Sequence, residues 1–264
     1  MAYTEVFTSV IDSYLPEPHA SLLNGIIFGV DLNAGKEFYE KVKIVGLLHI
    51  VVLSGINITI LASIISSSTS FLQKKYSVLI SLFCIILFVF FVGPEPPIVR
   101  AAFMGSLGLI AILWSAKATP LYILFLSFVL TAIFKLEWIK TISLQLSYGA
   151  TLGIILFGQA KNKKRSWLGE FLARELRPSL AAQAFTTPII FLYFKQISLI
   201  APVSNLLTSF IVPPLMIFGF LTAILGKIHF SLGLLPSFIC YVLLSYIIFV
   251  IDFLAKLPFV FIQF

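Results

Sequence analysis

Long apolar runs, separated by short polar connectors such as Gly93–Pro97, dominate the pattern of this chain. A run of about 20 apolar residues is long enough for a helix to cross a bilayer. The pattern therefore predicts an all-α polytopic membrane protein with about eight transmembrane or re-entrant helices. We expect them at 44–65, 77–93, 98–115, 119–135, 141–160, 179–196, 200–226 and 234–256.

Two features modify this pattern. Pro213 and Pro214 lie inside the seventh predicted span, where a proline pair breaks or kinks a helix, so this span is either kinked or re-entrant. The side of the membrane on which the C-terminus lies depends on that choice. Residues 1–43 hold more than half of the acidic side chains, and their apolar run 21–30 is too short to cross. We interpret 1–43 as an extracytoplasmic or interfacial segment and 44–264 as the multi-helix domain.

Composition agrees with a membrane protein. Hydrophobic residues make up 59% of the chain and charged residues 11%, whereas a soluble domain carries about 25% charged residues. The net charge of +7 is explained by lysine and arginine in cytoplasmic loops, so the charge alone does not indicate a nucleic-acid partner.

One connector is strongly basic and predicts the topology. Apolar residues 167, 168, 171 and 172 recur at helical spacing, which predicts a short amphipathic helix on the membrane that ends before Pro178. We place this loop in the cytoplasm and the N-terminal segment outside. Its basic side chains are Lys161, Lys163, Lys164, Arg165, Arg174 and Arg177.

The first predicted span carries polar groups near its middle, which are costly in hydrocarbon unless they have polar partners. They are His49, Ser54, Gly55 and Asn57. Two interpretations stay open, namely hydrogen bonding between helices and a helix that lines or gates a path. A hydrolytic His49–Ser54 pair is not expected, because five residues place the two side chains roughly 140° apart on one helix.

Other spans also carry polar side chains. Arg100 begins the third span, where its guanidinium either reaches the interface or lines a pore mouth that meets anions. Behind it, small residues including Gly105 and Gly108 suit tight helix packing. In the fifth span, hydroxyl residues repeat every four positions and form one stripe, from which Gln145 points away. The stripe consists of Ser143, Ser147 and Thr151.

Gln183 and Asn205, in the sixth and seventh spans, complete the candidates for the lining of a path. Asp252 is the one acid deep in an apolar run, and it needs a cation or donor that the sequence does not identify. Both cysteines lie in apolar runs and the three histidines are scattered, so we expect no metal site and no cofactor. No phosphate-binding loop motif occurs, so any energy for transport must come from another protein.

Five stretches together resemble the membrane domain of the ComEC family of competence proteins, over roughly residues 15–260. They are Leu15–Gly29 (LPEPHASLLNGIIFG), Gly46–Asn57 (GLLHIVVLSGIN), Pro96–Met104 (PPIVRAAFM), Ile142–Ala150 (ISLQLSYGA) and Ala201–Leu207 (APVSNLL). The resemblance implies a channel component that passes single-stranded DNA across the bacterial inner membrane. The resemblance implies a set of residues that line the channel or contact DNA. They are His49, Ser54, Gly55, Asn57, Arg100, Gln145, Ser147, Gln183 and Asn205.

The chain departs from the family pattern in two respects. Asn57 stands where the family's Ser-Gly-Leu-His pattern has histidine, which puts any role for an imidazole there in doubt. We also expect neither the family's extracellular oligonucleotide-binding domain nor its metallo-β-lactamase-like domain, and hence no enzyme activity. The expected partners are single-stranded DNA, the lipid bilayer, a DNA-receptor protein and a separate cytoplasmic helicase or ATPase, with homo-oligomerisation left open.

Two other functions remain as alternatives. The same polar and kinked spans suit a transporter or channel for another solute, such as an anion or a lipid, and a proton-coupled carrier would rely on a buried acid such as Asp252. The second alternative is that the chain is a membrane scaffold without a pore in a competence complex.

Overall fold

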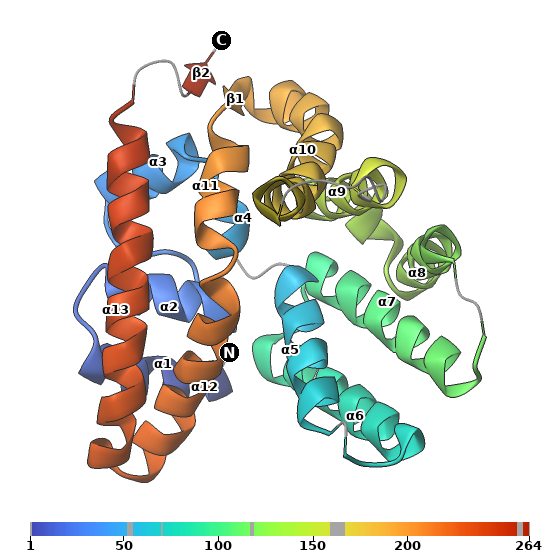
Figure 1. The fold of residues 1–264 in the computed structure, drawn as a ribbon, viewed down its shortest axis with the longest axis horizontal. Helices are drawn as coiled ribbons and strands as arrows, with labels where there is room; N and C mark the ends of the chain where they lie inside the picture. Colours follow the sequence, from blue (N-terminus) through green and yellow to red (C-terminus); the bar gives the residue numbers. More distant parts are fainter. Residues whose placement is uncertain are drawn as a thin grey trace. The chain divides into compact units, whose positions relative to one another are not determined.

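Helices form nearly all of the chain that the structure describes (Figure 1). The computed structural model describes residues 2–51, 55–69, 71–116, 119–158, 167–257 and 261–263. Within these ranges, the two strands β1 (Gln196–Ser198) and β2 (Phe261–Gln263) pair antiparallel, and the other elements are helices. The predicted fold class, a helical membrane protein, is confirmed, and the strand pair is an addition that the sequence pattern did not indicate.

The chain divides into two compact units, Met1–Leu53 with Lys195–Phe264, and Ser54–Phe194. The first unit joins the N-terminal helices to the C-terminal ones, and α12 and α13 run antiparallel within it (Figure 1). Its helices are α1 (Ala2–Tyr14), α2 (His19–Phe28), α3 (Lys36–Ile44), α4 (Leu48–Val51), α11 (Ala201–Thr208), α12 (Val212–Ile228) and α13 (Phe230–Ala255). Residues 20–28 of α2 are all buried, so this stretch belongs to the core of the unit. The extracytoplasmic or interfacial position of 1–43 stays a prediction.

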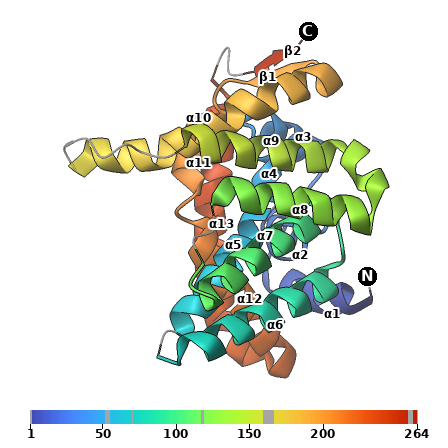
Figure 2. The ribbon, with the colours of Figure 1, turned by 90° about the vertical axis from the view of Figure 1, so that its right-hand side faces the viewer.

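The second unit is a stack of helices in which α6, α7, α8 and α9 follow one another from bottom to top in Figure 2. The unit consists of α5 (Gly55–Ser68), α6 (Lys74–Val92), α7 (Pro96–Leu113), α8 (Pro120–Phe134), the 3-10 helix η1 (Leu136–Lys140), α9 (Ile142–Phe157) and α10 (Trp167–Phe194). Prolines occupy the first turns of α7 and α8, where the missing N–H has no helical partner to lose.

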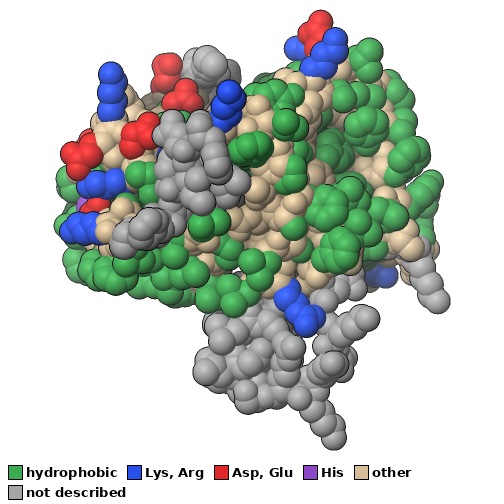
Figure 3. Space-filling view, turned by 90° about the horizontal axis from the view of Figure 1, so that it is seen from above, with side chains coloured by type: hydrophobic (Ala, Val, Ile, Leu, Met, Phe, Trp, Pro, Cys, Tyr) green, Lys and Arg blue, Asp and Glu red, His purple; other side chains and the backbone are tan. Residues whose placement is uncertain are grey.

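Exposed helix faces are as apolar as the buried ones, which is typical of a protein in lipid. On α6, Val78 and Ile85 are buried, whereas Phe83, Ile86 and Phe90 on other faces are more than half exposed. A helix that is hydrophobic all round does not stand in water with such a face open. Viewed from above, hydrophobic side chains cover large areas, and charged side chains gather mostly near the edges of the view (Figure 3).

The count of eight spans is not confirmed. Among the described residues, three helices are long and apolar enough to cross a membrane, namely α6, α7 and α13. The pair α11 and α12 adds a fourth if the two helices, bent by 54°, form one broken span. This bend confirms the predicted interruption of the seventh span, and the proline pair lies in the first turn of α12 just after the break. Helices α8 and α9 match their predicted ranges to within three residues but are shorter.

The first predicted span, 44–65, is not one helix, so this prediction was wrong. Helix α3 ends at Ile44, and Gly46 adopts a positive φ of 76° that most side chains disfavour. Hydroxyl groups from the other end of the chain satisfy the carbonyls at this break. Ser198 Oγ donates to the Ile44 oxygen at 2.7 Å, and Ser204 Oγ donates to the Val45 oxygen at 2.6 Å.

The predicted end of a helix before Pro178 was also wrong. Helix α10 runs from Trp167 to Phe194 and contains both Pro178 and Pro188. The predicted amphipathic helix and the sixth span are therefore one continuous helix. Proline at these positions removes a hydrogen bond, which a helix packed against neighbours in a membrane can tolerate.

Close helix packing occurs at different glycines from those expected. A Cβ atom built on Gly153 of α9 would overlap the backbone oxygen of Ala181 in α10, and one on Gly149 would lie 3.3 Å from Ile189. By contrast, a Cβ on Gly108 of α7 would have no neighbour within 4 Å, and one on Gly105 would make an ordinary contact. The Gly-x-x-x-Gly spacing of 149 and 153 lets the backbones of α9 and α10 approach each other.

We expect Gly153→Ala to destabilise the protein by about 1–3 kcal/mol, because its methyl group must push α10 away from α9. Thermal unfolding of the purified protein in detergent measures this effect. Gly108→Ala is the matched control, since its methyl group enters open space and alanine favours a helix. Equal melting temperatures for the two variants would contradict the close approach of α9 and α10.

Candidate functional site

Arg100 of α7 is the most unusual charge in the second unit. It lies one turn into a helix that is apolar enough to cross a membrane, and only 7% of it is exposed. Neighbouring Ala101 and Ala102 are also buried, so this turn of α7 faces other helices. Arg100 is therefore held among helices, and both interpretations of its position, at the membrane interface and at a pore mouth, stay predictions.

The partners of the guanidinium are neutral groups. Nη1 donates to Thr151 Oγ1 at 2.8 Å and to Met104 Sδ at 3.2 Å, and Nη2 donates to Ser147 Oγ at 2.5 Å. Ser147 and Thr151 are two members of the hydroxyl stripe on α9, and their spacing of four residues places both on the face that meets Arg100. The structure thus brings together Arg100 and Ser147, two of the residues singled out in the sequence.

Tyr148 extends this site to a third helix. The Arg100 Cζ atom lies 5.6 Å from the centre of the Tyr148 ring, within reach of a cation–π interaction. The Tyr148 hydroxyl lies 3.3 Å from both Ser127 Oγ and Thr131 Oγ1 of α8, which are fully buried. Tyr148 was not among the candidates, because an aromatic residue in an apolar span gives no distinctive signal.

The charge of Arg100 has no carboxylate partner in the part of the chain that the structure describes. The ion pairs found there join Lys41 to Glu37 and Asp252, and Lys43 to Glu40. Arg100 Nε is buried without a hydrogen-bond partner among the same residues. The site is therefore positively charged, and it has an N–H group to offer an acceptor.

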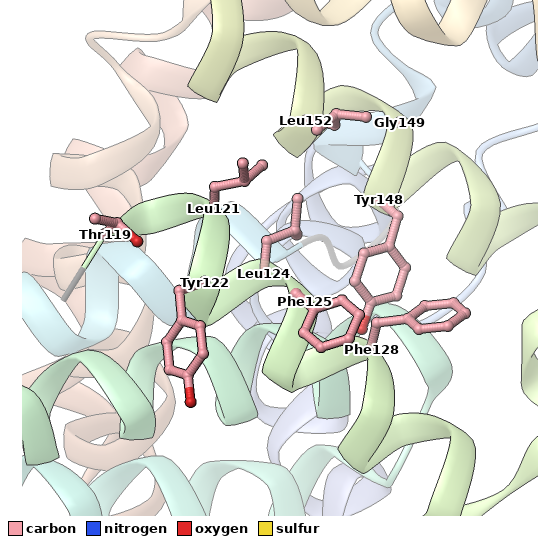
Figure 4. A pocket seen from close by; sticks show the side chains of 9 residues that line it. All are labelled: Thr119, Leu121, Tyr122, Leu124, Phe125, Phe128, Tyr148, Gly149 and Leu152. Atoms are coloured by element: carbon pink, nitrogen blue, oxygen red, sulfur yellow. The ribbon is translucent and has the colours of Figure 1, made fainter.

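An apolar groove between α8 and α9 borders the site (Figure 4). Its volume is about 640 Å³, and Tyr148 belongs to its lining as well as to the Arg100 contact. The remaining lining residues are mostly aromatic or aliphatic: Thr119, Leu121, Tyr122, Leu124, Phe125, Phe128, Gly149 and Leu152. The Tyr148 ring therefore contacts both the groove and the guanidinium of Arg100.

Gln145, Gln183 and Asn205 do not join Arg100 in the contacts described. Gln145 Oε1 accepts from the Tyr193 hydroxyl of α10 at 3.3 Å, and its amide donates to the Ile139 oxygen. Gln183 lies half-buried on α10, and Asn205 belongs to α11 in the other unit. The amide groups are therefore separate features of the fold.

Several candidates lie wholly or partly outside the described residues. His49 belongs to α4, and Gly55 and Asn57 belong to α5, but the description does not extend to their side chains, and it does not include Ser54. In the basic loop, the positions outside the description are Lys161, Lys163, Lys164 and Arg165. Arg174 and Arg177 belong to α10, and Arg177 is half-buried. Their assignments stay predictions.

Asp252 has the cation that the sequence did not identify. Its Oδ1 lies 3.1 Å from Lys41 Nζ of α3, and Lys41 also contacts Glu37 at 2.9 Å. Side chains of α3 and α13 are thereby linked within the first unit. These residues are 211 positions apart in the sequence (252 − 41), so helical spacing alone gave no sign of the pair.

Two further polar contacts in the first unit were not predicted from the sequence. His19 Nε2 lies 3.0 Å from Ser245 Oγ, and the His19 ring stacks on Tyr241 with centroids 4.6 Å apart. Asn24 Nδ2 donates to Asp12 Oδ1 at 2.8 Å. Burial lowers the pKa of His19 and raises the pKa of Asp12 relative to their ordinary values. These contacts join α2 to α13 and to α1.

No metal site is found among the described residues, where no three His, Cys, Asp or Glu side chains gather. The arrangement around Arg100 offers hydrogen-bond donors and positive charge but no nucleophile paired with a base. Such a set of groups is chemically suited to bind an anion.

Comparisons with known proteins identify similar chains. Residues 26–264 match the model of the family described as Competence protein. The protein named ComE operon protein 3 of Bacillus subtilis (strain 168) is 26% identical over 234 residues, which covers 84% of this chain and 30% of that relative. The chain thus spans about a third of the length of that relative. No solved structure matches the chain.

We expect Asp252→Asn to lower the free energy of unfolding by up to about 1 kcal/mol, because the pair with Lys41 is partly exposed to solvent.

Hydrogen bonds to Glu37 and Asp252 raise the pKa of Lys41 above its ordinary value of 10.5. A raised lysine pKa contributes stability at neutral pH that is lost as pH rises through the folded-state pKa. The difference in melting temperature between wild type and Lys41→Met should therefore shrink only above about pH 10.5.

Lys43→Met is the control for this series, since the ion pair that Lys43 makes among the described residues lies within its own helix, with Glu40 at 3.5 Å. It should change the melting temperature much less. If Lys43→Met and Lys41→Met were equally destabilised at neutral pH, the link between α3 and α13 would contribute nothing measurable.

Proposed function

Because the chain belongs to the Competence protein family, we propose that it is a channel component that passes single-stranded DNA through the bacterial inner membrane during DNA uptake. The observation that carries this proposal is Arg100, a buried cation with neutral ligands on a helix long and apolar enough to cross a membrane. Charged residues within membrane helices are costly and commonly mark the pathway of a substrate.

The chemistry of Arg100 suits a DNA backbone. Proteins that bind single-stranded DNA without sequence preference place cations near phosphates and aromatic rings near bases. Arg100 provides the cation, and Tyr148 provides an aromatic ring beside it. The basic residues at 161–165 are proposed as a second set of cations on the cytoplasmic side.

Interrupted helices are a second observation that supports a path for a substrate through the membrane. The break at Gly46 and the bend between α11 and α12 place irregular backbone among apolar helices. Transporters build their substrate sites from such interruptions. This feature supports passage of some substrate, and Arg100 indicates that the substrate is an anion.

In this proposal the chain acts as a passive conduit rather than as an enzyme. A DNA-receptor protein would deliver the strand, and a separate cytoplasmic helicase or ATPase would supply the energy. The alternative of a proton-coupled carrier depended on Asp252 as an isolated acid. Its ion pair with Lys41 gives this carboxylate a structural role, so no described contact favours that alternative.

A genetic test uses a transformable bacterium that lacks its own member of the family. The chain is expressed there alone and together with the remaining segments of that host's protein, and labelled DNA that reaches the cytoplasm is measured. We expect uptake above the deletion background, and Arg100→Gln should reduce it at least about tenfold, since the buried cation is removed. Lys140→Gln, which removes an exposed lysine from η1 in the same unit, should leave uptake unchanged.

Folded wild-type protein that yields no uptake in either arrangement would contradict the conduit proposal. Uptake that is equal in wild type and Arg100→Gln would contradict the role of Arg100 but not the conduit itself.

A further inference from the structure

Arg100 is held at rest by groups that an anion can replace. Of its five N–H groups, three have described acceptors, namely the hydroxyls of Thr151 and Ser147 and the sulfur of Met104. Nε has none among the described residues, although it is buried. We infer that Arg100 is an exchangeable binding site for a phosphodiester group, and that the hydroxyls of Ser147 and Thr151 are resting ligands that limit its affinity.

Phosphodiester oxygens are better acceptors for this guanidinium than the present ones. The present bonds from the guanidinium to hydroxyl oxygens involve one charge, whereas bonds to phosphodiester oxygens join two opposite charges, and the planar fork of arginine binds two oxygens of one anion at once. Nε and one N–H of Nη2 are without a described acceptor, so an anion can form two bonds while displacing at most Ser147.

The two hydroxyls are not equivalent. Thr151 donates its own proton to the backbone oxygen of Ser147 at 2.9 Å, so its position is fixed by α9. Ser147 accepts from Nη2, whose other N–H has no described acceptor, whereas both N–H groups of Nη1 have one. Ser147 is therefore the ligand that an incoming anion replaces, and Thr151 keeps the guanidinium in place.

Neutral resting ligands allow release as well as binding. A buried arginine without ligands would bear the full cost of desolvation and would hold any anion that reached it tightly. The hydroxyl groups offset part of that cost before the anion arrives. A site that binds one phosphate after another needs such a limit on its affinity, because each phosphate must leave again.

A lipid headgroup and a DNA backbone both present a phosphodiester. The identification of DNA as the source rests on the proposed function, whereas the phosphodiester site itself rests on the contacts of Arg100. Direct binding to the purified protein separates the two, since it requires no transport.

The experiment measures binding of a fluorescein-labelled oligothymidylate and of an abasic strand of equal length. The full chain is placed in nanodiscs of phosphatidylcholine, whose phosphodiester is neutralised by its own choline group, and parallel discs that contain phosphatidylglycerol test competition by a lipid phosphodiester with a net negative charge. We expect both strands to bind, and Arg100→Gln to weaken both at least about tenfold, or about 1.4 kcal/mol. Arg100→Lys, which keeps the charge but not the fork, should bind with intermediate affinity.

Ser147→Ala gives the result that a merely structural role would not produce. Removal of the competing hydroxyl should tighten binding of both strands by about threefold to tenfold. In the uptake assay the same variant should slow passage, because release becomes slower. Lys140→Gln serves as the control for the loss of one positive charge elsewhere in the unit.

Weaker or unchanged binding by folded Ser147→Ala would overturn the assignment of Ser147 as a competing ligand. Wild-type binding by Arg100→Gln would overturn the site, and Ser147→Ala still tests it if Arg100→Gln does not fold. Absence of strand binding in discs of phosphatidylcholine alone would overturn DNA as the source, and a rise in melting temperature with phosphatidylglycerol that Arg100→Gln abolishes would support a phosphodiester site for lipid. Strand binding by the purified protein can succeed where uptake in the host fails, so the binding site and the conduit proposal are tested separately.

Discussion

A guanidinium inside apolar helices must receive its polar partners from neighbouring helices, and this constraint organises the second unit. Arg100 of α7 obtains two hydroxyls from α9, and the Tyr148 ring that covers it is held through its own hydroxyl by α8. Removing the partners would leave a buried charge without compensation, which is among the most costly defects a fold can carry. The packing of these three helices is therefore tied to the position of one side chain.

Close backbone approach completes this arrangement. Because Gly149 and Gly153 carry no side chain, α10 packs directly on one side of α9, while Ser147 and Thr151 face α7. Helix α9 thus holds small residues and hydroxyl residues on different faces. Lipid supplies no hydrophobic force between helices, so such packing and hydrogen bonds between helices must determine how they associate.

Local patterns predicted much of this fold, and long-range contacts limited the prediction. The apolar runs located α6, α7, α8, α9 and α13 to within a few residues, and the period of four placed Ser147 and Thr151 together. Neither pattern could pair them with Arg100, which is about fifty residues away. The break at Gly46 was missed for the same reason, because the hydroxyls that satisfy it come from Ser198 and Ser204. Pro178 misled the prediction because a proline indicates a helix end only where no neighbouring helix supports the chain.

Four of the five stretches that carry the family resemblance contribute residues to two contacts in space. Pro96–Met104 contributes Arg100, and Ile142–Ala150 contributes Ser147 and Tyr148, so these two stretches together build the candidate site. In the other unit, Gly46 of the second stretch approaches Ala201 of the fifth, since a Cβ built on Gly46 would lie 2.6 Å from that of Ala201. The contact between Gly46 and Ala201 lies at a break in a helix, and the contact between Arg100 and Ser147 compensates a buried charge. A helix break and a buried charge are both costly in an apolar environment unless a second segment supplies polar partners, so in each contact one stretch depends on the other.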